Sequence, residues 1–327
     1  MYARRRSGRY NSSIMVRTLA HGIQALMQKL DRWQQRRQLI GFVFAVVRKY
    51  LDDEAGARAA LLAYYGFLSL FPLLLILTTV FRIVLHNDPG LSGEIIHSAV
   101  SYFPALGQSL QENVHSLDKA GLTLVVGILL ALFGARGVAD VLQTSLDHIW
   151  QVPYSHRRHF PQSLLRSLGI VIVGGVCLAV APVIFGYALN FAPSRVVSVI
   201  SALLTAVVMF WLLVWVIKFG SSARQPLHRI WLGAFVAVVA LSVLQAIGGF
   251  IVGHELQRLD TLYGTFALVL GIIFWLYLQT QLLLLALEVD PVRAFKLAPR
   301  SFQSPLTDGD RAAYQLYHSR GKFHDGL

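Results

Sequence analysis

The chain of 327 residues is 55% hydrophobic and only 14% charged, whereas a soluble protein carries about 25% charged residues. Its formal net charge is +12, and Cys177 is its single cysteine. The composition excludes an ordinary water-soluble domain, and one cysteine excludes an intrachain disulfide or a cysteine-based metal site. The positive charge fits either a nucleic-acid binder or a membrane protein with basic cytoplasmic loops, and its distribution along the chain distinguishes them.

The first 38 residues are polar and basic, and we expect them to form a cytoplasmic N-terminal segment without a cleavable signal peptide. Residues 39–54 then predict an amphipathic helix that lies in the cytoplasmic membrane interface and leads into the first span. The apolar side of this helix is expected to contain Phe42, Val43, Val46, Val47 and Tyr50.

Six stretches are long and apolar enough to cross a bilayer as helices. In the first, residues 59–85, the 23 positions between Arg58 and Arg82 hold no charge and rise about 35 Å as a helix, against about 30 Å of hydrocarbon. Pro72 in this span and Pro182 in the third are expected to kink their helices and are candidate hinges. The other spans are expected at residues 121–141, 165–189, 196–219, 230–252 and 263–287.

Lysine and arginine gather in the N-terminal segment, in the second-to-third and fourth-to-fifth connections, and in the C-terminal tail. The remaining connections carry one each: Lys119, Arg195 and Arg258. The positive-inside rule therefore places both termini in the cytoplasm and assigns the basic charge to topology instead of nucleic-acid binding. The predicted fold is an all-α polytopic membrane protein with a six-span domain at residues 39–290 and a cytoplasmic tail at 291–327. Residues 86–120 are expected to form short amphipathic helices on the extracytoplasmic face.

Three elements carry a family resemblance. They read ALLAYYGFLSLFP at residues 60–72, ALFGARGVADVLQTSLDHIW at 131–150, and YGTF, WLY and ALEVD beginning at 263, 275 and 286. Over about residues 40–292 the chain resembles the YihY/BrkB family of bacterial inner-membrane proteins, once labelled ribonuclease BN-like. The resemblance implies six spans in a bacterial inner membrane, a role in envelope physiology and, for one branch, export of lipid precursors of lipopolysaccharide. Asp147 and His148 replace the usual Leu-Asn style pair, and Ala286 stands where glycine is common, so no role is carried over to those positions.

Arg136 and Asp140 lie four residues apart on one face of the second span. Because a charge at mid-bilayer costs about 2.5–3.5 kcal/mol on insertion scales, the two are expected to pair or to reach toward the interface. Glu288 of the sixth span is expected at a similar depth and could share Arg136. The residues predict either a cytoplasmic gate or anionic headgroup site centred on Arg136, or a structural ion pair.

Uncharged polar residues within the spans either line a central cavity for a substrate or form interhelical hydrogen bonds worth about 0.6 kcal/mol each. They are Tyr64, Tyr65, Ser69, Gln245, Gln279 and Gln281. Candidate contacts to lipid headgroups are Arg82, Arg157 and Arg158. Small residues at every fourth position of the second span predict close helix packing, or a mobile helix pair that gates a path: Gly127, Ala131, Ala135 and Ala139, with Gly134 and Gly137 beside them. Gly249 and Gly253 on the fifth span are a similar pair.

No Walker, HExxH or GxSxG pattern occurs, and His156 and His159 have no accompanying third ligand. We therefore expect no enzyme activity, no metal and no cofactor. The sequence favours a transporter or flippase-like protein for a lipid or other amphipathic envelope component, with anionic membrane lipids as partners and no nucleic acid. The alternative is a non-transporting scaffold or assembly factor with envelope proteins or a second copy as partner. A membrane ribonuclease would need a cytoplasmic metal-binding cluster.

Overall fold

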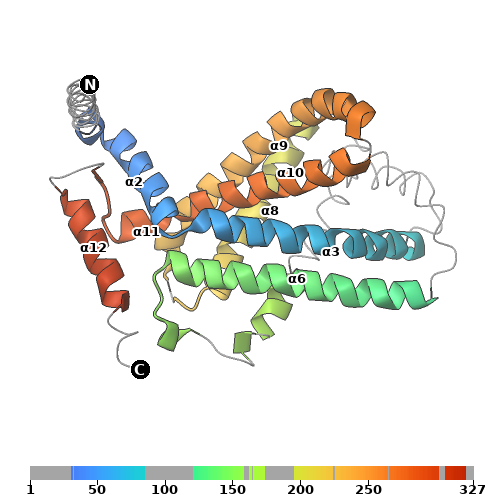
Figure 1. Cartoon of the computed structure of the whole chain (residues 1–327), viewed down its shortest axis with the longest axis horizontal. Coiled ribbons are helices and arrows are strands. Elements are labelled where there is room, and N and C mark those ends of the chain that lie inside the picture. The colour runs from blue at the N-terminus through green and yellow to red at the C-terminus, as the bar shows by residue number, and fades with distance from the viewer. Residues whose placement is uncertain are drawn as a thin grey trace, which may run out of the picture. The chain divides into compact units, whose positions relative to one another are not determined.

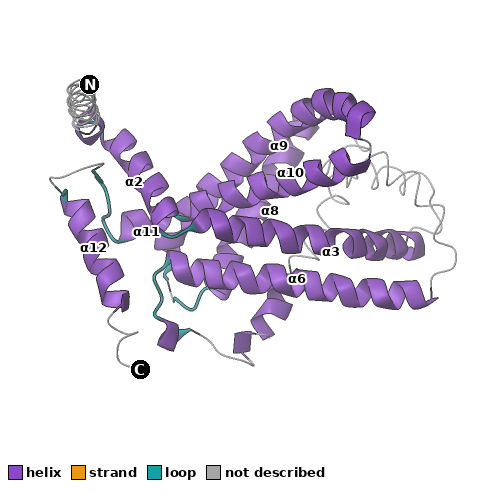
Figure 2. Ribbon diagram, viewed as in Figure 1, coloured by secondary structure: helices purple, strands orange, loops and turns teal. Residues whose placement is uncertain are grey.

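The computed structural model describes residues 31, 33–84, 121–157, 162–163, 165–173, 195–223, 225–263, 265–301 and 306–321. These residues form helices and connecting turns, without a strand among them (Figures 1 and 2). The helices are α2 (Gln38–Asp52), α3 (Ala55–Val84), α6 (Gly121–Ile149), α8 (Arg195–Gly220), α9 (Leu227–Tyr263), α10 (Thr265–Leu287), α11 (Val289–Ala294) and α12 (Asp308–Gly321), with a 3-10 turn at Tyr154–His156.

Three helical stretches within the described residues are long and apolar enough to cross a membrane: Ala202–Gly220, Leu227–Gly248 and Val269–Ala294. They coincide with the predicted fourth, fifth and sixth spans. On α9, every fourth residue is a large apolar side chain exposed at the surface of the protein: Trp231, Phe235, Val239, Val243 and Ile247. A stripe of this kind is stable against acyl chains and unfavourable against water, so α9 presents a lipid-facing side.

The remaining predicted spans are matched to different extents. The first corresponds to α3, which has 30 residues and continues as helix past Pro72. The second corresponds to α6, which extends eight residues beyond the predicted end at Val141. Of the third, residues 165–173 are helical, while Pro182 lies outside the described residues. The predicted helices at residues 86–120 also lie outside them.

The structure divides into two compact units, residues 50–290 and the two terminal segments 1–49 and 291–327 together. This division differs from the predicted one, which separated the N-terminal segment from the C-terminal tail and placed residues 39–49 with the membrane domain. Within the larger unit, α3 packs between α6 and α10, and α9 packs against α10 and α8 (Figure 1).

Helices that pack against each other in the order α6, α3, α10, α9 and α8 are antiparallel, as their contacts show. Gly134 of α6 lies against Ser69 of α3, and Thr280 of α10 donates a hydrogen bond of 2.9 Å to the carbonyl of Ala59 on α3. Consequently α3 and α9 begin, and α6, α8 and α10 end, at the same end of the bundle. We call this the polar end, because the buried charged and hydrogen-bonding side chains of the unit gather there.

The helices α6 and α8, in contrast, run in the same direction. Gly220 at the end of α8 lies against Leu146 near the end of α6. Since α8 has 26 residues, its first residue, Arg195, lies about 39 Å away along the helix axis. The predicted third span lies between these two parallel helices in the sequence, and residues 165–173 of it are helical. Near the start of this helical stretch, Arg166 donates a hydrogen bond of 2.6 Å to the carbonyl of Phe219 at the end of α8.

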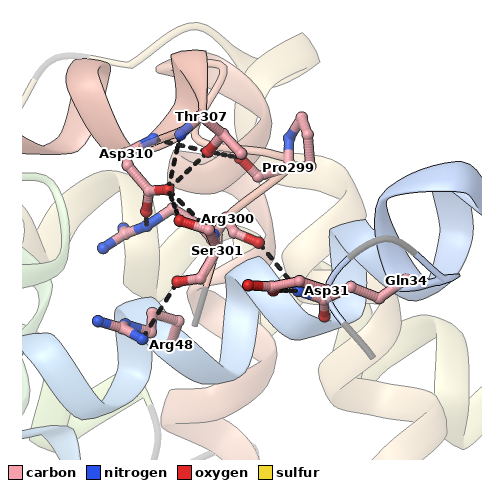
Figure 3. Close-up of polar contacts among 8 residues, drawn as sticks. All are labelled: Asp31, Gln34, Arg48, Pro299, Arg300, Ser301, Thr307 and Asp310. Atoms are coloured by element: carbon pink, nitrogen blue, oxygen red, sulfur yellow. Dashed lines mark hydrogen bonds and ion pairs between the residues drawn. The ribbon is translucent and has the colours of Figure 1, made fainter. Parts of the chain in front are cut away.

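The terminal unit joins segments that are more than 250 positions apart in the sequence (Figure 3). Gln34 donates a hydrogen bond of 3.0 Å to the carbonyl of Arg300, and Arg48 donates one of 3.4 Å to that of Ser301. Both terminal segments therefore belong to one compact unit. The predicted even number of spans, six, is compatible with this arrangement.

The carboxylate of Asp310 organises the C-terminal half of this unit. It accepts hydrogen bonds from the backbone N–H groups of Ser301 and Thr307, from both of their hydroxyls, and from Nε of Arg300 at 2.8 Å (Figure 3). Burial raises the pKa of Asp310, but these hydrogen bonds outweigh it and lower the pKa to about 2. Thr307 and Asp310 form a capping box at the start of α12, which the Thr-x-x-Asp spacing encodes.

Candidate functional site

The polar end is held by a carboxylate that joins α6 to the α8–α9 turn. Asp147, one helical turn from Trp150, accepts a hydrogen bond of 2.5 Å from the backbone N–H of Ser222 and further ones from the hydroxyls of Ser221 and Ser222 at 3.2 and 2.8 Å. Asp147 is buried, so its charge is balanced by these donors. The arrangement fixes the end of α8 beside the end of α6.

A second set of contacts joins the start of α3 to the end of α6. Arg58 lies 2.7 Å from Nδ1 of His148, and Gln151 donates a hydrogen bond of 2.8 Å to Asp53. Gln151 has a positive φ of 52°, and the backbone N–H of Val152 bonds back to the carbonyl of Asp147 at 2.8 Å. This is the hydrogen-bond pattern of a Schellman motif, and it ends α6 at this position.

Glu288, at the end of α10, is fully buried and lies near Tyr50. Burial, Tyr277 and the charge of Glu288 raise the pKa of Tyr50 above its ordinary value of 10, and the amide of Gln281 acts in the opposite direction. The structure does not pair Glu288 with Arg136. These two candidate residues therefore belong to different parts of the bundle.

Arg136 pairs instead with Asp140, its Nε lying 3.4 Å from the Asp140 carboxylate. The hydroxyl of Ser167 also donates a short hydrogen bond to Asp140, and the amide of Gln143 donates one of 2.8 Å to Ser167. The side chains of Arg136 and Asp140 remain 53% and 42% exposed. The pair is thus fixed by neighbouring polar groups on one side and open on the other.

Arg136 lies near the middle of α6, 15 positions after Gly121 and 13 before Ile149. Arg136 precedes Asp147 by eleven positions, which is about 16 Å along the helix axis. If Asp147 marks the edge of the hydrocarbon, a core of about 30 Å has its midplane near Arg136.

Two of the candidate cavity residues, Tyr65 and Ser69, pack against glycines of α6. A Cβ at Gly134 would lie 2.7 Å from Cβ of Ser69 and 2.9 Å from its backbone nitrogen, and a Cβ at Gly137 would overlap the ring of Tyr65. These distances show that the backbones of α3 and α6 approach closely. Tyr65 and Ser69 therefore have a packing role here, while Tyr64 is 57% exposed.

Small residues create this close approach, and the two that do so were predicted beside the four-residue repeat. Gly134 and Gly137 make the contacts with α3. A corresponding contact joins α9 to α10, where the indole of Trp275 covers Gly248, next to the predicted Gly249. Both contacts exclude larger side chains at the glycine positions.

The other candidates do not gather into one cavity. Gln245 on α9 and Gln279 on α10 are half-buried, and Gln281 lies beside Tyr50. Arg157 donates a hydrogen bond of 3.3 Å to the carbonyl of Val152 and lies over the ring of Tyr154. Arg158 and the side chains of Arg82 and Pro72 lie outside the described residues.

Among the described residues, no group of three or more His, Cys, Asp or Glu side chains could hold a metal ion. Sequence reasoning missed the binding partners of Asp140 and Asp147, namely Ser167 and the Ser221–Ser222 pair. Two consecutive serines directly after an apolar helix are a helix-end signal. Their partner, however, is 74 or 75 positions away, which no local pattern identifies.

Apolar exposed helices, long enough to span, that carry their polar contacts at one end define an integral membrane protein of the all-helical class. The sequence model described as Virulence factor BrkB matches residues 46–304, which is most of the chain. The protein belongs to the BrkB family.

Relatives agree with this assignment. The chain is 23% identical to a UPF0761 membrane protein of Psychrobacter over 82% of its own length and 51% of the relative's, and 24% identical to one of Alcanivorax borkumensis over 74% and 58%. It thus spans about half the length of these two relatives. It is also 24% identical to the putative ribonuclease-like protein YfkH of Bacillus subtilis, over 77% of its own length and 94% of that protein. No solved structure matches the chain.

Proposed function

We propose that this protein moves a lipid or similar amphipathic molecule across the bacterial inner membrane, and that the polar headgroup passes the Arg136–Asp140 pair on α6. The observation that supports this proposal is a charged pair near mid-depth of a span that stays about half exposed. Charges at this depth cost about 2.5–3.5 kcal/mol each on insertion scales. A pair with only a structural role would be expected to be covered by neighbouring helices.

The chemistry of the pair suits a phosphate-containing headgroup. Arg136 approaches Asp140 through Nε, and its side chain remains 53% exposed, so a headgroup can reach its guanidinium. A guanidinium with both terminal nitrogens available binds phosphate oxygens in a bidentate manner. Asp140 is held by Ser167 and keeps Arg136 in position, which gives the site a fixed geometry.

The acyl chains of such a molecule can remain in the bilayer while its headgroup follows α6. The exposed residues that flank the pair on this helix are apolar, among them Leu132 and Phe133. A headgroup that leaves the water needs polar partners inside the membrane, and Arg136 supplies one about halfway. In this proposal both termini lie in the cytoplasm, on the side of the basic segments.

The test is a lipid-translocation assay with the full chain in proteoliposomes. Vesicles contain fluorescent NBD-phosphatidylglycerol or NBD-phosphatidylethanolamine, and dithionite bleaches the label only in the outer leaflet. We expect the wild type to expose inner-leaflet label faster than protein-free vesicles, with and without an imposed proton gradient. Arg136→Gln should slow this rate about tenfold, which corresponds to about 1.4 kcal/mol.

Arg229→Gln is the matched control, because Arg229 is an exposed arginine in the first turn of α9 at the polar end. It should translocate at the wild-type rate. Arg136→Lys keeps the charge but loses the bidentate geometry and should give an intermediate rate. If the wild type does not accelerate translocation of either lipid, the proposal fails and a non-transporting scaffold becomes the better hypothesis. Equal rates for the wild type and Arg136→Gln would remove the role of the pair.

A further inference from the structure

The helix α2 has two different faces. Leu39, Val43 and Val47 follow one another at four-residue steps and are 82%, 60% and 39% exposed, and Leu51 continues the series at 65%. We call these four residues the α2 stripe. The opposite side holds Gly41, Ala45 and Lys49, which are buried. Gly41 is packed closely on this side, since a Cβ there would lie 3.2 Å from the carbonyl oxygen of Gln34 and 3.6 Å from Cβ of Pro299.

The predicted apolar side of this helix was different. Val43 and Val47 lie on the stripe, but Val46 is buried, and Phe42 and Tyr50 are half-buried. Exposed aliphatic residues on a helix facing water are unfavourable when they form a continuous row of about 18 Å. The α2 stripe therefore needs an occupant.

The chain itself indicates what this occupant is. Only two residues separate the end of α2 at Asp52 from the start of α3 at Ala55, and α3 corresponds to the predicted first membrane span. A helix joined so closely to a spanning helix remains at the surface of the bilayer. Arg36 and Arg37, immediately before α2, are exposed. Basic residues beside an aliphatic stripe are typical of helices that lie on an anionic lipid surface.

A second copy of the chain fits this stripe less well. A specific protein interface buries about 1,200–2,000 Å² in total and needs shape complementarity. A single row of four aliphatic side chains is narrow by this measure, whereas a lipid surface adapts to any such row. We propose that the α2 stripe binds the surface of the anionic leaflet at the level between headgroups and acyl chains.

This binding would also fix the position of the C-terminal segment. The buried face of α2 and the residues before it hold that segment through the hydrogen bonds of Gln34 with Arg300 and of Arg48 with Ser301. Anchoring α2 through its stripe thus anchors the terminal unit at the membrane surface. The helix α12 is then presented next to the same leaflet.

The experiment uses the full chain with Cys177→Ser and one introduced cysteine carrying an NBD label. Val43→Cys reports on the stripe. Gln38→Cys is the control, because Gln38 is exposed on the same helix but lies about 140° around it from Val43. The proteins are reconstituted in phosphatidylcholine vesicles with a quarter phosphatidylglycerol. Quenching is measured with brominated acyl chains and with aqueous iodide.

We expect the brominated lipid to quench the Val43 label about twofold more than the Gln38 label, and iodide to show the reverse order. Arg36→Gln combined with Arg37→Gln should remove the increase in lipid quenching that phosphatidylglycerol gives over phosphatidylcholine alone. Equal access of iodide to both positions would overturn the proposal, because the stripe would then face water. Protection of the Val43 label from both quenchers would overturn it as well, because protein would then cover the stripe.

Discussion

Replacing Gly134 by alanine tests whether the backbones of α3 and α6 are as close as the structure shows. The new Cβ would lie 2.7 Å from Cβ of Ser69 and 2.9 Å from both its Cα and its backbone nitrogen. Nonbonded carbons are most stable at about 3.5–4.0 Å, so the helices would have to separate by about 1 Å. Rotation of the Ser69 side chain cannot relieve the contact, because two of the three atoms belong to the backbone.

The magnitude follows from two opposing effects. Overpacking of a well-packed core costs about 1–3 kcal/mol, and contact with backbone atoms places this site at the upper end. Alanine in a helix gains about 1 kcal/mol over glycine. The net loss is therefore about 2 kcal/mol, which lowers the midpoint of thermal unfolding by about 3 °C for a chain of this size.

The assay is thermal unfolding of the purified protein in detergent, followed by tryptophan fluorescence. Gly169→Ala is the matched control, since a Cβ at Gly169 meets nothing within 4 Å. This variant should be as stable as the wild type or slightly more stable. Adding Ser69→Gly to Gly134→Ala removes the shortest contact and should recover part of the loss. If Gly134→Ala unfolds at or above the wild-type temperature, the close approach of α3 and α6 is wrong.

Two further substitutions separate a strong interaction from a weak one. Asp310→Asn should destabilise the terminal unit by about 1–3 kcal/mol, because a charged acceptor for several donors is lost; protease resistance of α12 measures this. In the wild type the pKa of Asp310 is lowered from 3.8 to about 2. The stabilisation is therefore present above pH 4 and is lost as the pH falls toward 2. Asp310→Asn should not show this loss of stability at low pH. Thr280→Val removes the interhelical hydrogen bond to Ala59 and should cost only about 0.6 kcal/mol in thermal unfolding. A loss of several kcal/mol would show that the hydroxyl does more than join α10 to α3.

Long apolar runs made the helices readable from the sequence, because a stretch such as residues 196–219 has few alternatives to a spanning helix. The family resemblance is confirmed, because the BrkB model matches residues 46–304. The predicted positions of helix ends were less accurate. The second span was predicted to end at Val141, but α6 continues to Ile149, because its last two turns leave the apolar part and form the polar end.

The packing faces of the helices could not be predicted from apolar runs in the sequence. Tyr65 and Ser69 fit a substrate cavity or a packing site equally well until Gly134 and Gly137 are found opposite them. The buried side of α2 was also undetermined, because apolar residues occur on both of its faces. A segment near Pro299, more than 250 positions later, decides which face is covered. Local periodicity contains no information on such a partner.

Two independent observations constrain the number of membrane crossings. Gln34 and Arg300 belong to one compact unit, so we expect the chain between residues 49 and 291 to cross an even number of times. Five long helices, α3, α6, α8, α9 and α10, are described in that interval, and five crossings would leave the two terminal segments on opposite sides. The parallel course of α6 and α8 is compatible with the predicted third span, residues 165–189, as a sixth crossing between them. If introduced cysteines at Arg36 and Arg311 were labelled from opposite sides of the membrane, the terminal unit could not exist as described, and the even number of crossings would be wrong.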